Sequence, residues 1–237
     1  MKKHWPSRIT AYGKSLLHLF FPRLCAGCHR NLHTGETGIC LVCMASLPRT
    51  LFTGGTDHAL HKIFWGRVEI RYATALLAFR RGGITQRLIH GIKYHAQHDT
   101  ARVLGMELGR CILHMQWQVD VIVPVPLTRE RYRQRGYNQS EWIAREVAEI
   151  LGVPCETFCV LRSGNRKSQT RKGRYERWLN ADHSFRLADP MRLAGKHVLV
   201  VDDVITTGAT LEAIAALLTN LPDCRVSVAA LAFSVRS

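Results

Sequence analysis

Two adjacent carboxylates, Asp202 and Asp203, lie between an aliphatic run at residues 198–201 and a turn rich in hydroxyl groups. The turn consists of Thr206, Thr207, Gly208, Ala209 and Thr210. Carboxylate oxygens can accept hydrogen bonds from two vicinal sugar hydroxyls, directly or through a bound cation and its water. The hydroxyls and N–H groups of the turn would surround a phosphate, and glycine permits a positive φ and a close backbone approach. This segment predicts a sugar-phosphate site.

The elements around the acidic pair are predicted from the pattern of apolar residues. Residues 198–201 read Val-Leu-Val-Val, a continuous run typical of a strand buried on both faces of a parallel sheet. After the turn, one apolar face continues from Leu211 through Ile214 and Leu218, which predicts a helix. The carboxylates would therefore lie at the carboxyl end of a central strand, beside a helix N-terminus.

Two other interpretations of this segment fit the sequence less well. Receiver domains also place an acidic pair after an aliphatic strand, but they need most of their sheet afterwards, and only 34 residues follow Asp203. A plain strand, turn and helix with capping threonines needs no ligand, although two neighbouring carboxylates would then repel each other without a partner. Both comparisons favour a ligand site.

A second segment predicts an anion site. Residues 119–126 read as a strand stopped by Pro124 and Pro126, and four alternating arginines follow at positions 129, 131, 133 and 135. A helix then opens after Gly136, with a polar capping residue before it. The alternative is a solvated loop, because charge runs usually lie on the surface.

A third segment, residues 162–180, is strongly basic and nearly devoid of apolar anchors. Its cations include Arg166, Lys167, Arg171, Lys172, Arg174 and Arg177. Long polar segments inside compact domains are typically lids or linkers. We predict a lid that closes over a phosphorylated ligand or contacts nucleic acid.

The acidic pair followed by Thr-Thr-Gly-x-Thr resembles the ribose-5-phosphate loop of type I phosphoribosyltransferases, which bind 5-phosphoribosyl-1-pyrophosphate (PRPP). With Pro-Val-Pro at 124–126, Arg-Gly-Tyr-Asn-Gln at 135–139 and Ile-Lys-Tyr at 92–94, the chain resembles the competence protein F (ComF) family. The resemblance implies PRPP contacts at Pro126, Arg129, Arg135, Gln169 and Arg177, besides the turn. The chain departs from many members at Arg166 and Lys172, so no contact is carried over there.

The resemblance also implies a fold and a function. The fold is α/β, a type I phosphoribosyltransferase-like parallel sheet flanked by helices. The function is DNA uptake, competence or use of extracellular DNA, through Mg²⁺-dependent phosphoribosyl transfer to a nucleobase-type acceptor, with Asp202 and Asp203 as catalytic residues. Single-stranded DNA and competence machinery such as a DNA-translocating helicase are the expected partners.

A catalytic role is not the only interpretation. Some relatives place an acid–base residue between the carboxylates and the threonines, where this chain has Val204 and Ile205. The alternative is a non-catalytic competence protein that senses PRPP and binds single-stranded DNA. A PRPP-dependent transcriptional regulator is disfavoured, because the sequence shows no helix-turn-helix.

Four cysteines near the N-terminus have metal-ligand spacing. Cys25 and Cys28 are followed, after eleven residues, by Cys40 and Cys43. Two such pairs, joined by a short glycine-containing hairpin, favour a structural Zn²⁺ ribbon over an iron–sulfur centre. Two disulfides or four unpaired thiols are the alternatives, and His29 and His33 are rival ligands. A zinc ribbon precedes the transferase-like domain in many ComF members.

Composition limits the remaining possibilities. The 237 residues are 46% hydrophobic, enough for one substantial α/β domain and a small appendage. We predict an N-terminal helical segment (1–24), a zinc ribbon (25–47) and a phosphoribosyltransferase-like domain (48–237). The net charge of +15 indicates an anionic partner, although a solvated basic surface would give the same value.

The N-terminus does not fit a secretion signal. Its apolar patch at residues 16–21 is short and contains His18, whereas a signal needs an uninterrupted apolar core. No run approaches the ~18 apolar residues of a membrane-spanning helix. We therefore expect a cytoplasmic protein without membrane insertion.

Overall fold

The computed structural model describes residues 22–50, 52, 57–162 and 184–234. Residues 1–21 of the predicted N-terminal helical segment (1–24) and nearly all of the predicted lid, including Gln169 and Arg177, lie outside these residues. Residues 22–24 are described and are not helical. The helices are α2 (Leu41–Ala45), α3 (Ala59–Lys62), α4 (Ile84–Tyr94), α5 (His98–His114), α6 (Arg129–Arg135), α7 (Gln139–Leu151), η1 (Pro190–Arg192) and α9 (Ala209–Thr219). The strands are β1 (Ala73–Phe79), β2 (Val121–Pro124), β3 (Val160–Arg162), β4 (Phe185–Leu187), β5 (His197–Ile205) and β6 (Arg225–Ser234).

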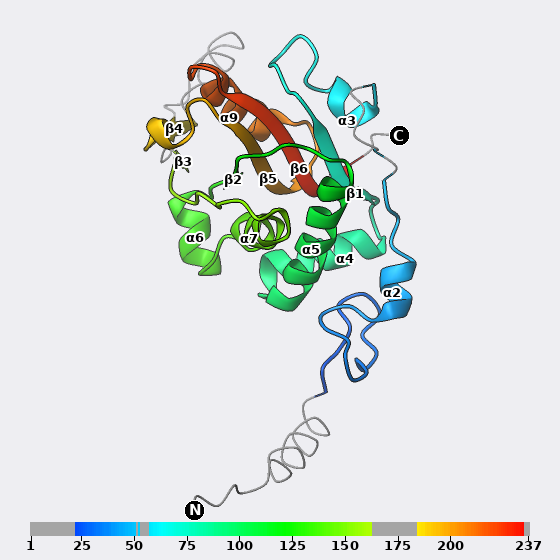
Figure 1. Cartoon of the computed structure of the whole chain (residues 1–237). Coiled ribbons are helices and arrows are strands. Elements are labelled where there is room, and N and C mark those ends of the chain that lie inside the picture. The colour runs from blue at the N-terminus through cyan, green and yellow to red at the C-terminus, as the bar shows by residue number, and fades with distance from the viewer. Residues whose placement is uncertain (1–21, 51, 53–56, 163–183, 235–237) are drawn as a thin grey trace, which may run out of the picture.

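Four parallel strands form the central sheet in the order β1-β6-β5-β2 (Figure 1). The aliphatic run at residues 198–201 lies in β5 and is completely buried. Such burial requires cover on both faces of the sheet, which the predicted parallel arrangement provides. A separate antiparallel pair, β3 and β4, lies beyond the β2 edge.

Each face of the sheet packs against its own set of helices. Leu199 and Val201 of β5 belong to one hydrophobic cluster with residues of α4, α5 and α7. Val198 and Val200, which alternate with them, belong to a second cluster with residues of α3 and α9. Helix α7, which comes after β2 and α6, therefore lies on one face of the sheet, and α9, which follows β5, lies on the other. This arrangement opens a crevice between the carboxyl ends of the two strands.

The arginine-rich segment after β2 is helical, a form that the sequence pattern did not predict, since it left a solvated loop as the alternative to an anion site. Thr128 caps α6 by accepting a hydrogen bond from the N–H of Arg131, and Gly136 ends the helix at a φ of 78°. Helix α7 begins directly afterwards, where Asn138 accepts a hydrogen bond from the N–H of Ser140 at 3.1 Å. The Asn138 amide also donates to the carbonyl of Val125 at 3.1 Å, which fixes the helix to the end of β2.

The four-cysteine ribbon, predicted at residues 25–47, begins at Arg23 in the structure, because Arg23 and Leu24 pair with residues 31–32. It packs against α4 and α5 (Figure 1). Arg87 of α4 donates a hydrogen bond to the carbonyl of Gly27 at 3.1 Å. A Cβ atom on Gly38 would lie only 2.7 Å from the backbone nitrogen of Thr100, so the ribbon and the start of α5 are in close contact. Within the described part of the chain, no helix has the length and apolar character needed to cross a membrane.

Candidate functional site

The acidic pair lies near the carboxyl end of β5, as predicted, but the two carboxylates differ in environment. Asp203 is buried, with 4% of its surface exposed, while Asp202 is half-buried. One oxygen of Asp202 accepts hydrogen bonds from the hydroxyl of Ser140 at 3.0 Å and from the N–H of Asp203 at 2.8 Å. Helix α7 therefore holds Asp202 in place.

The threonine turn joins β5 to α9 as predicted. Gly208 has a φ of 76° and stands at the N-terminus of α9. A side chain at this position would meet Ile63 at 2.8 Å and Phe64 at 3.1 Å. Arg67 donates to the carbonyl of Thr207 at 3.3 Å and pairs with Glu212 of α9. The turn is therefore supported from outside by residues 63–67.

The crevice contains two cavities. The loop cavity, of about 40 Å³, is formed by residues 204–211 and Asp202. The inner cavity, of about 170 Å³, adjoins it, because Asp202, Val204 and Thr210 line both. The inner cavity is otherwise bounded by Lys93, Pro126, Arg131, Arg135, Arg162 and Asp203, together with residues of the β2–α6 connection and α7.

Four cations converge on the inner cavity: Lys93, Arg131, Arg135 and Arg162. Only the structure assigns Lys93 and Arg162 to this site. The ammonium of Lys93, at the end of α4, lies 3.1 Å from a carboxylate oxygen of Asp203. Arg162 of β3 lies over the ring of Phe185 at 5.1 Å. Burial lowers the pKa of Arg162, the positive charge of Arg131 lowers it further, and Asp202 opposes this shift. The four cations outnumber the two aspartates that line the inner cavity, so the cavity is positively charged.

Tyr137 positions the end of α4 at the site. Its ring stacks on Trp142 with 4.0 Å between centroids. Its hydroxyl donates to the carbonyl of Ile92 at 2.8 Å and accepts from the N–H of Ala96 at 3.1 Å. Tyr137 therefore fixes both the last turn of α4, which carries Lys93, and the connection to α5.

The predicted arginine contacts are only partly brought together. Arg135 lines the inner cavity, and its guanidinium donates to Gln139 at 2.7 Å. Arg129 is exposed on α6 and does not line either cavity, whereas Arg131, two residues on, lines the inner one. The helical form of α6 explains this, because side chains two residues apart point in different directions on a helix. Pro126 lines the inner cavity.

Replacing Asp202 should change the pH dependence of stability. Burial and the charge of Asp203 raise the pKa of Asp202 to about 7. An unfolded aspartate titrates near pH ~3.9, so the native state retains a proton that the unfolded state has lost, and stability falls as pH rises through that window. We expect Asp202→Asn to raise the melting temperature by about 10 °C at about pH 8 and very little at about pH 4, where the unfolded aspartate is itself half protonated. Thermal melts at both pH values, with Asp223→Asn at an exposed aspartate as control, test this. An equal shift at both pH values would contradict it.

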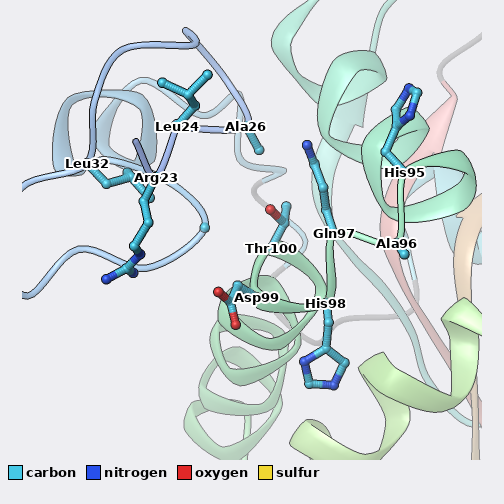
Figure 2. A pocket seen from close by; sticks show the side chains of 11 residues that line it. Arg23, Leu24, Ala26, Leu32, His95, Ala96, Gln97, His98, Asp99 and Thr100 are labelled. Carbon is cyan, nitrogen blue, oxygen red and sulfur yellow. The ribbon is translucent and has the colours of Figure 1, made fainter. Parts of the chain in front are cut away.

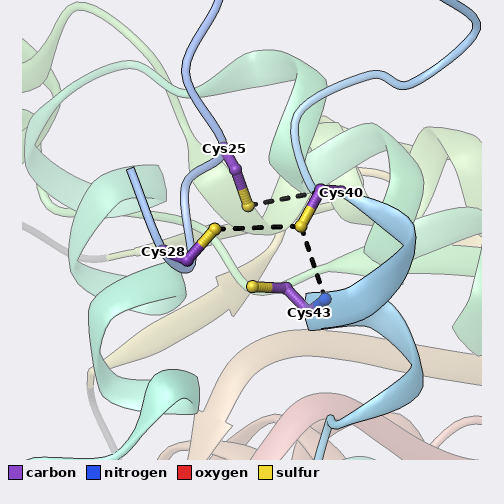
Figure 3. Close-up of side chains that lie close together, drawn as sticks. All are labelled: Cys25, Cys28, Cys40 and Cys43. Carbon is purple, nitrogen blue, oxygen red and sulfur yellow. Dashed lines mark hydrogen bonds between the residues drawn. The ribbon is translucent and has the colours of Figure 1, made fainter. Parts of the chain in front are cut away.

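The four cysteines meet as the spacing predicted (Figure 3). Their sulfurs all lie within 4.8 Å of one another, and those of Cys28 and Cys40 are 3.8 Å apart. Sulfurs bound at ~2.3 Å to one tetrahedral ion would be separated by about 3.8 Å. All eight cysteines are free thiols, so the disulfide alternative is not observed. Burial raises the pKa of Cys25, but N–H donors including those of Cys40 and Gly27 lower it to about 6 overall. The cluster is positioned to bind a metal ion.

A separate cavity of about 360 Å³ lies where the ribbon meets α5 (Figure 2). Arg23, Leu24 and Leu32 approach it from the ribbon, and residues 95–100 form the facing wall. It shares no residue with the inner cavity or the loop cavity. It is therefore distinct from the acidic site.

Comparisons with known proteins agree with this architecture. The phosphoribosyl transferase domain family model matches residues 138–236. The chain is 30% identical over 220 residues to the DNA utilization protein YhgH of Escherichia coli strain K12, covering 84% of this chain and 92% of that protein. It is 27% identical over 223 residues to competence protein F of Haemophilus influenzae, covering 85% and 93%.

Among solved structures, glutamine PRPP amidotransferase from B. subtilis, complexed with ADP and GMP, is 20% identical with a TM-score of 0.43. That likeness covers 59% of this chain and 30% of the other, and it carries no functional argument. The domain match and the parallel sheet confirm the predicted type I phosphoribosyltransferase-like fold.

Proposed function

The chain belongs to the competence protein F (ComF) family, a DNA-utilisation family with a phosphoribosyltransferase domain, and we propose that it binds PRPP at the carboxyl ends of β2 and β5. One observation carries the proposal: the acidic pair, the glycine turn and four cations converge on adjoining cavities. PRPP presents two ribose hydroxyls, a phosphate monoester and a pyrophosphate, and each has a chemically matching partner there.

Each part of PRPP is assigned to one part of the site. The ribose hydroxyls donate to the carboxylates of Asp202 and Asp203. The 5-phosphate takes the loop cavity, where Thr206 to Thr210 and the N-terminus of α9 supply N–H and hydroxyl donors. The pyrophosphate takes the inner cavity, beside Arg131 and Arg135. Gly208 makes the backbone approach possible.

The proposed reaction is phosphoribosyl transfer to a nucleobase-type acceptor. The bond between ribose C1 and pyrophosphate breaks with its electron pair leaving on pyrophosphate. A nitrogen of the acceptor bonds to C1, and the proton that this nitrogen loses passes to the departing pyrophosphate. Lys93, Arg131 and Arg135 would stabilise the departing negative charge, so the contribution of the chain is positioning and electrostatics. The carboxylate oxygens of Asp202 and Asp203 are the type of ligand that Mg²⁺ takes. When bound with PRPP, Mg²⁺ would neutralise part of the pyrophosphate charge.

Pyrophosphate release tests whether the bound PRPP is consumed. The full-length protein, PRPP and Mg²⁺ are incubated with single bases, nucleosides or a single-stranded oligonucleotide, and pyrophosphate is measured with a coupled enzyme assay. We expect acceptor-dependent release that Asp202→Ala/Asp203→Ala abolishes. Release that the double variant retains would show that the acidic pair is not the site.

The alternative is a non-catalytic PRPP sensor that binds single-stranded DNA. Apart from the acidic pair, the described residues lining the two cavities offer no proton acceptor, and Val204 and Ile205 are apolar. An acceptor base would then lack activation. In this case PRPP binds without pyrophosphate release, and strand binding weakens steeply with salt because phosphate contacts release counterions. A DNA-translocating helicase as partner and a cytoplasmic location remain predictions under both functions.

For the ribbon we propose a structural Zn²⁺ bound by Cys25, Cys28, Cys40 and Cys43. All-thiolate tetrahedral sets of this spacing are typical of closed structural zinc sites. The geometry leaves no role for His29 or His33, since neither belongs to the described metal-ligand cluster. The ion would contribute folding energy rather than chemistry.

A further inference from the structure

A larger cavity, which we call the outer cavity, adjoins the PRPP site on its open side. Its volume is about 470 Å³, and it lies between the α4–α5 turn and helix α6. Its polar and aromatic walls are formed by Lys93, Tyr94, His95, Arg131, Gln134 and Arg135. Lys93, Arg131 and Arg135 line the inner cavity as well, so the two cavities share one wall.

The outer cavity carries positive charge without compensation. None of its described lining residues is acidic, in contrast with the inner cavity and its two aspartates. Lys93 already pairs with Asp203, and Arg135 has only the neutral Gln139 as a side-chain hydrogen-bond partner among the described residues. Arg131 is exposed and forms no ion pair with any described residue. These arginines can therefore bind a phosphate group of a ligand.

The same cavity presents an aromatic face. Tyr94 is 60% exposed, and the guanidinium of Arg135 lies 5.0 Å from its ring centroid. The ring of His90 lies 4.7 Å away and supports Tyr94 from α4. The wall is also preorganised, because Tyr137 fixes the turn through its two hydrogen bonds. An exposed aromatic ring beside arginines is the combination that single-stranded nucleic acids use, stacking bases on rings and placing phosphates on cations.

We propose that the outer cavity binds a nucleotide unit of a single-stranded nucleic acid, with its base against Tyr94 and its phosphate on the side of Arg131 and Arg135 that faces this cavity. Each guanidinium has five N–H donors, so the same arginines can also contact the pyrophosphate of PRPP from the inner cavity. This inference rests on the proposed function, because it names the ligand that meets PRPP at the shared wall. The acceptor, or the polymer that is sensed together with PRPP, would then be a ligand that carries a phosphate group. A free nucleobase would place no anion on the outer-cavity side of Arg131 and Arg135.

Binding of a fluorescent oligothymidylate of about 10 nucleotides tests the inference. Anisotropy is measured for the full-length native protein, Tyr94→Ala and Tyr132→Ala. Tyr132 is a matched control, since it is 52% exposed on α6 but does not line the cavity. We expect Tyr94→Ala to weaken binding about tenfold, as loss of one stacked base would, and Tyr132→Ala to leave it unchanged. An oligouridylate arm shows whether the source of the nucleotide is DNA or RNA, and binding of either supports the site.

The outcomes separate this inference from the proposed function. PRPP binding is titrated on the same three proteins and should be equal in all of them. Strand binding that Tyr94→Ala leaves intact, or that both variants weaken equally, overturns the outer cavity while PRPP binding still stands. Absence of strand binding to the native protein also overturns it. Absence of PRPP binding by the native protein instead rejects the proposed function, whether or not the oligonucleotide binds.

Discussion

Replacing Cys25 and Cys28 with serine should abolish the proposed metal binding and lower the melting temperature by more than about 10 °C. The reason is that the ribbon belongs to the main core. Cys25, Cys43 and Leu47 share one hydrophobic cluster with Leu104 and Leu108 of α5. Structural zinc contributes about 10–16 kcal/mol of apparent binding energy in small zinc modules, and here its loss would also uncover one face of the larger domain.

Thermal melts and metal analysis check this expectation. The native protein should lose the same stability on treatment with a strong chelator and regain it with added Zn²⁺. Cys224→Ser is the control, because that cysteine is half-buried and lies outside the cluster. A metal-free protein that melts at the native temperature would contradict a structural role for zinc.

The main elements of the fold could be predicted because their signals are local. The uninterrupted run at residues 198–201 is typical of a central parallel strand, and the structure confirms it with complete burial. The polar residue before α7 predicted a helix start, and Asn138 caps it. The helix at residues 129–135 was missed because it has no apolar periodicity and buries none of its residues. Thr128 as a possible N-cap and Gly136 as a possible C-cap could have indicated this helix, but the four arginines between them are also typical of a solvated loop.

The candidate site could be predicted only where one segment carries it. Asp202, Asp203 and Gly208 share a continuous stretch, so their types and order were enough. Lys93 comes from a helix distant in sequence, and its contact with Asp203 depends on packing that a charge pattern does not contain. The family resemblance marked residues 92–94 without giving them a role. In the structure the carbonyl of Ile92 accepts a hydrogen bond from Tyr137, which fixes the end of α4, and Lys93 pairs with Asp203.

Loss of the acidic pair should have the second large effect, on PRPP binding. Asp202→Ala/Asp203→Ala removes both predicted acceptors of the ribose hydroxyls. Each hydrogen bond to a charged group contributes about 1.5–3 kcal/mol, so the pair should cost at least about a hundredfold in affinity. The same substitution leaves Lys93 without its partner, which makes a folding check necessary. Glu130→Gln is the control, because this carboxylate lies on α6 outside both cavities.

Calorimetric titration of the full-length protein with PRPP, with and without Mg²⁺, tests the central claim most directly. The account predicts binding that Mg²⁺ strengthens, that Glu130→Gln retains and that the well-folded double aspartate variant loses. Absence of binding to folded native protein, or equal binding by the double variant, would contradict a PRPP site at the carboxyl end of β5.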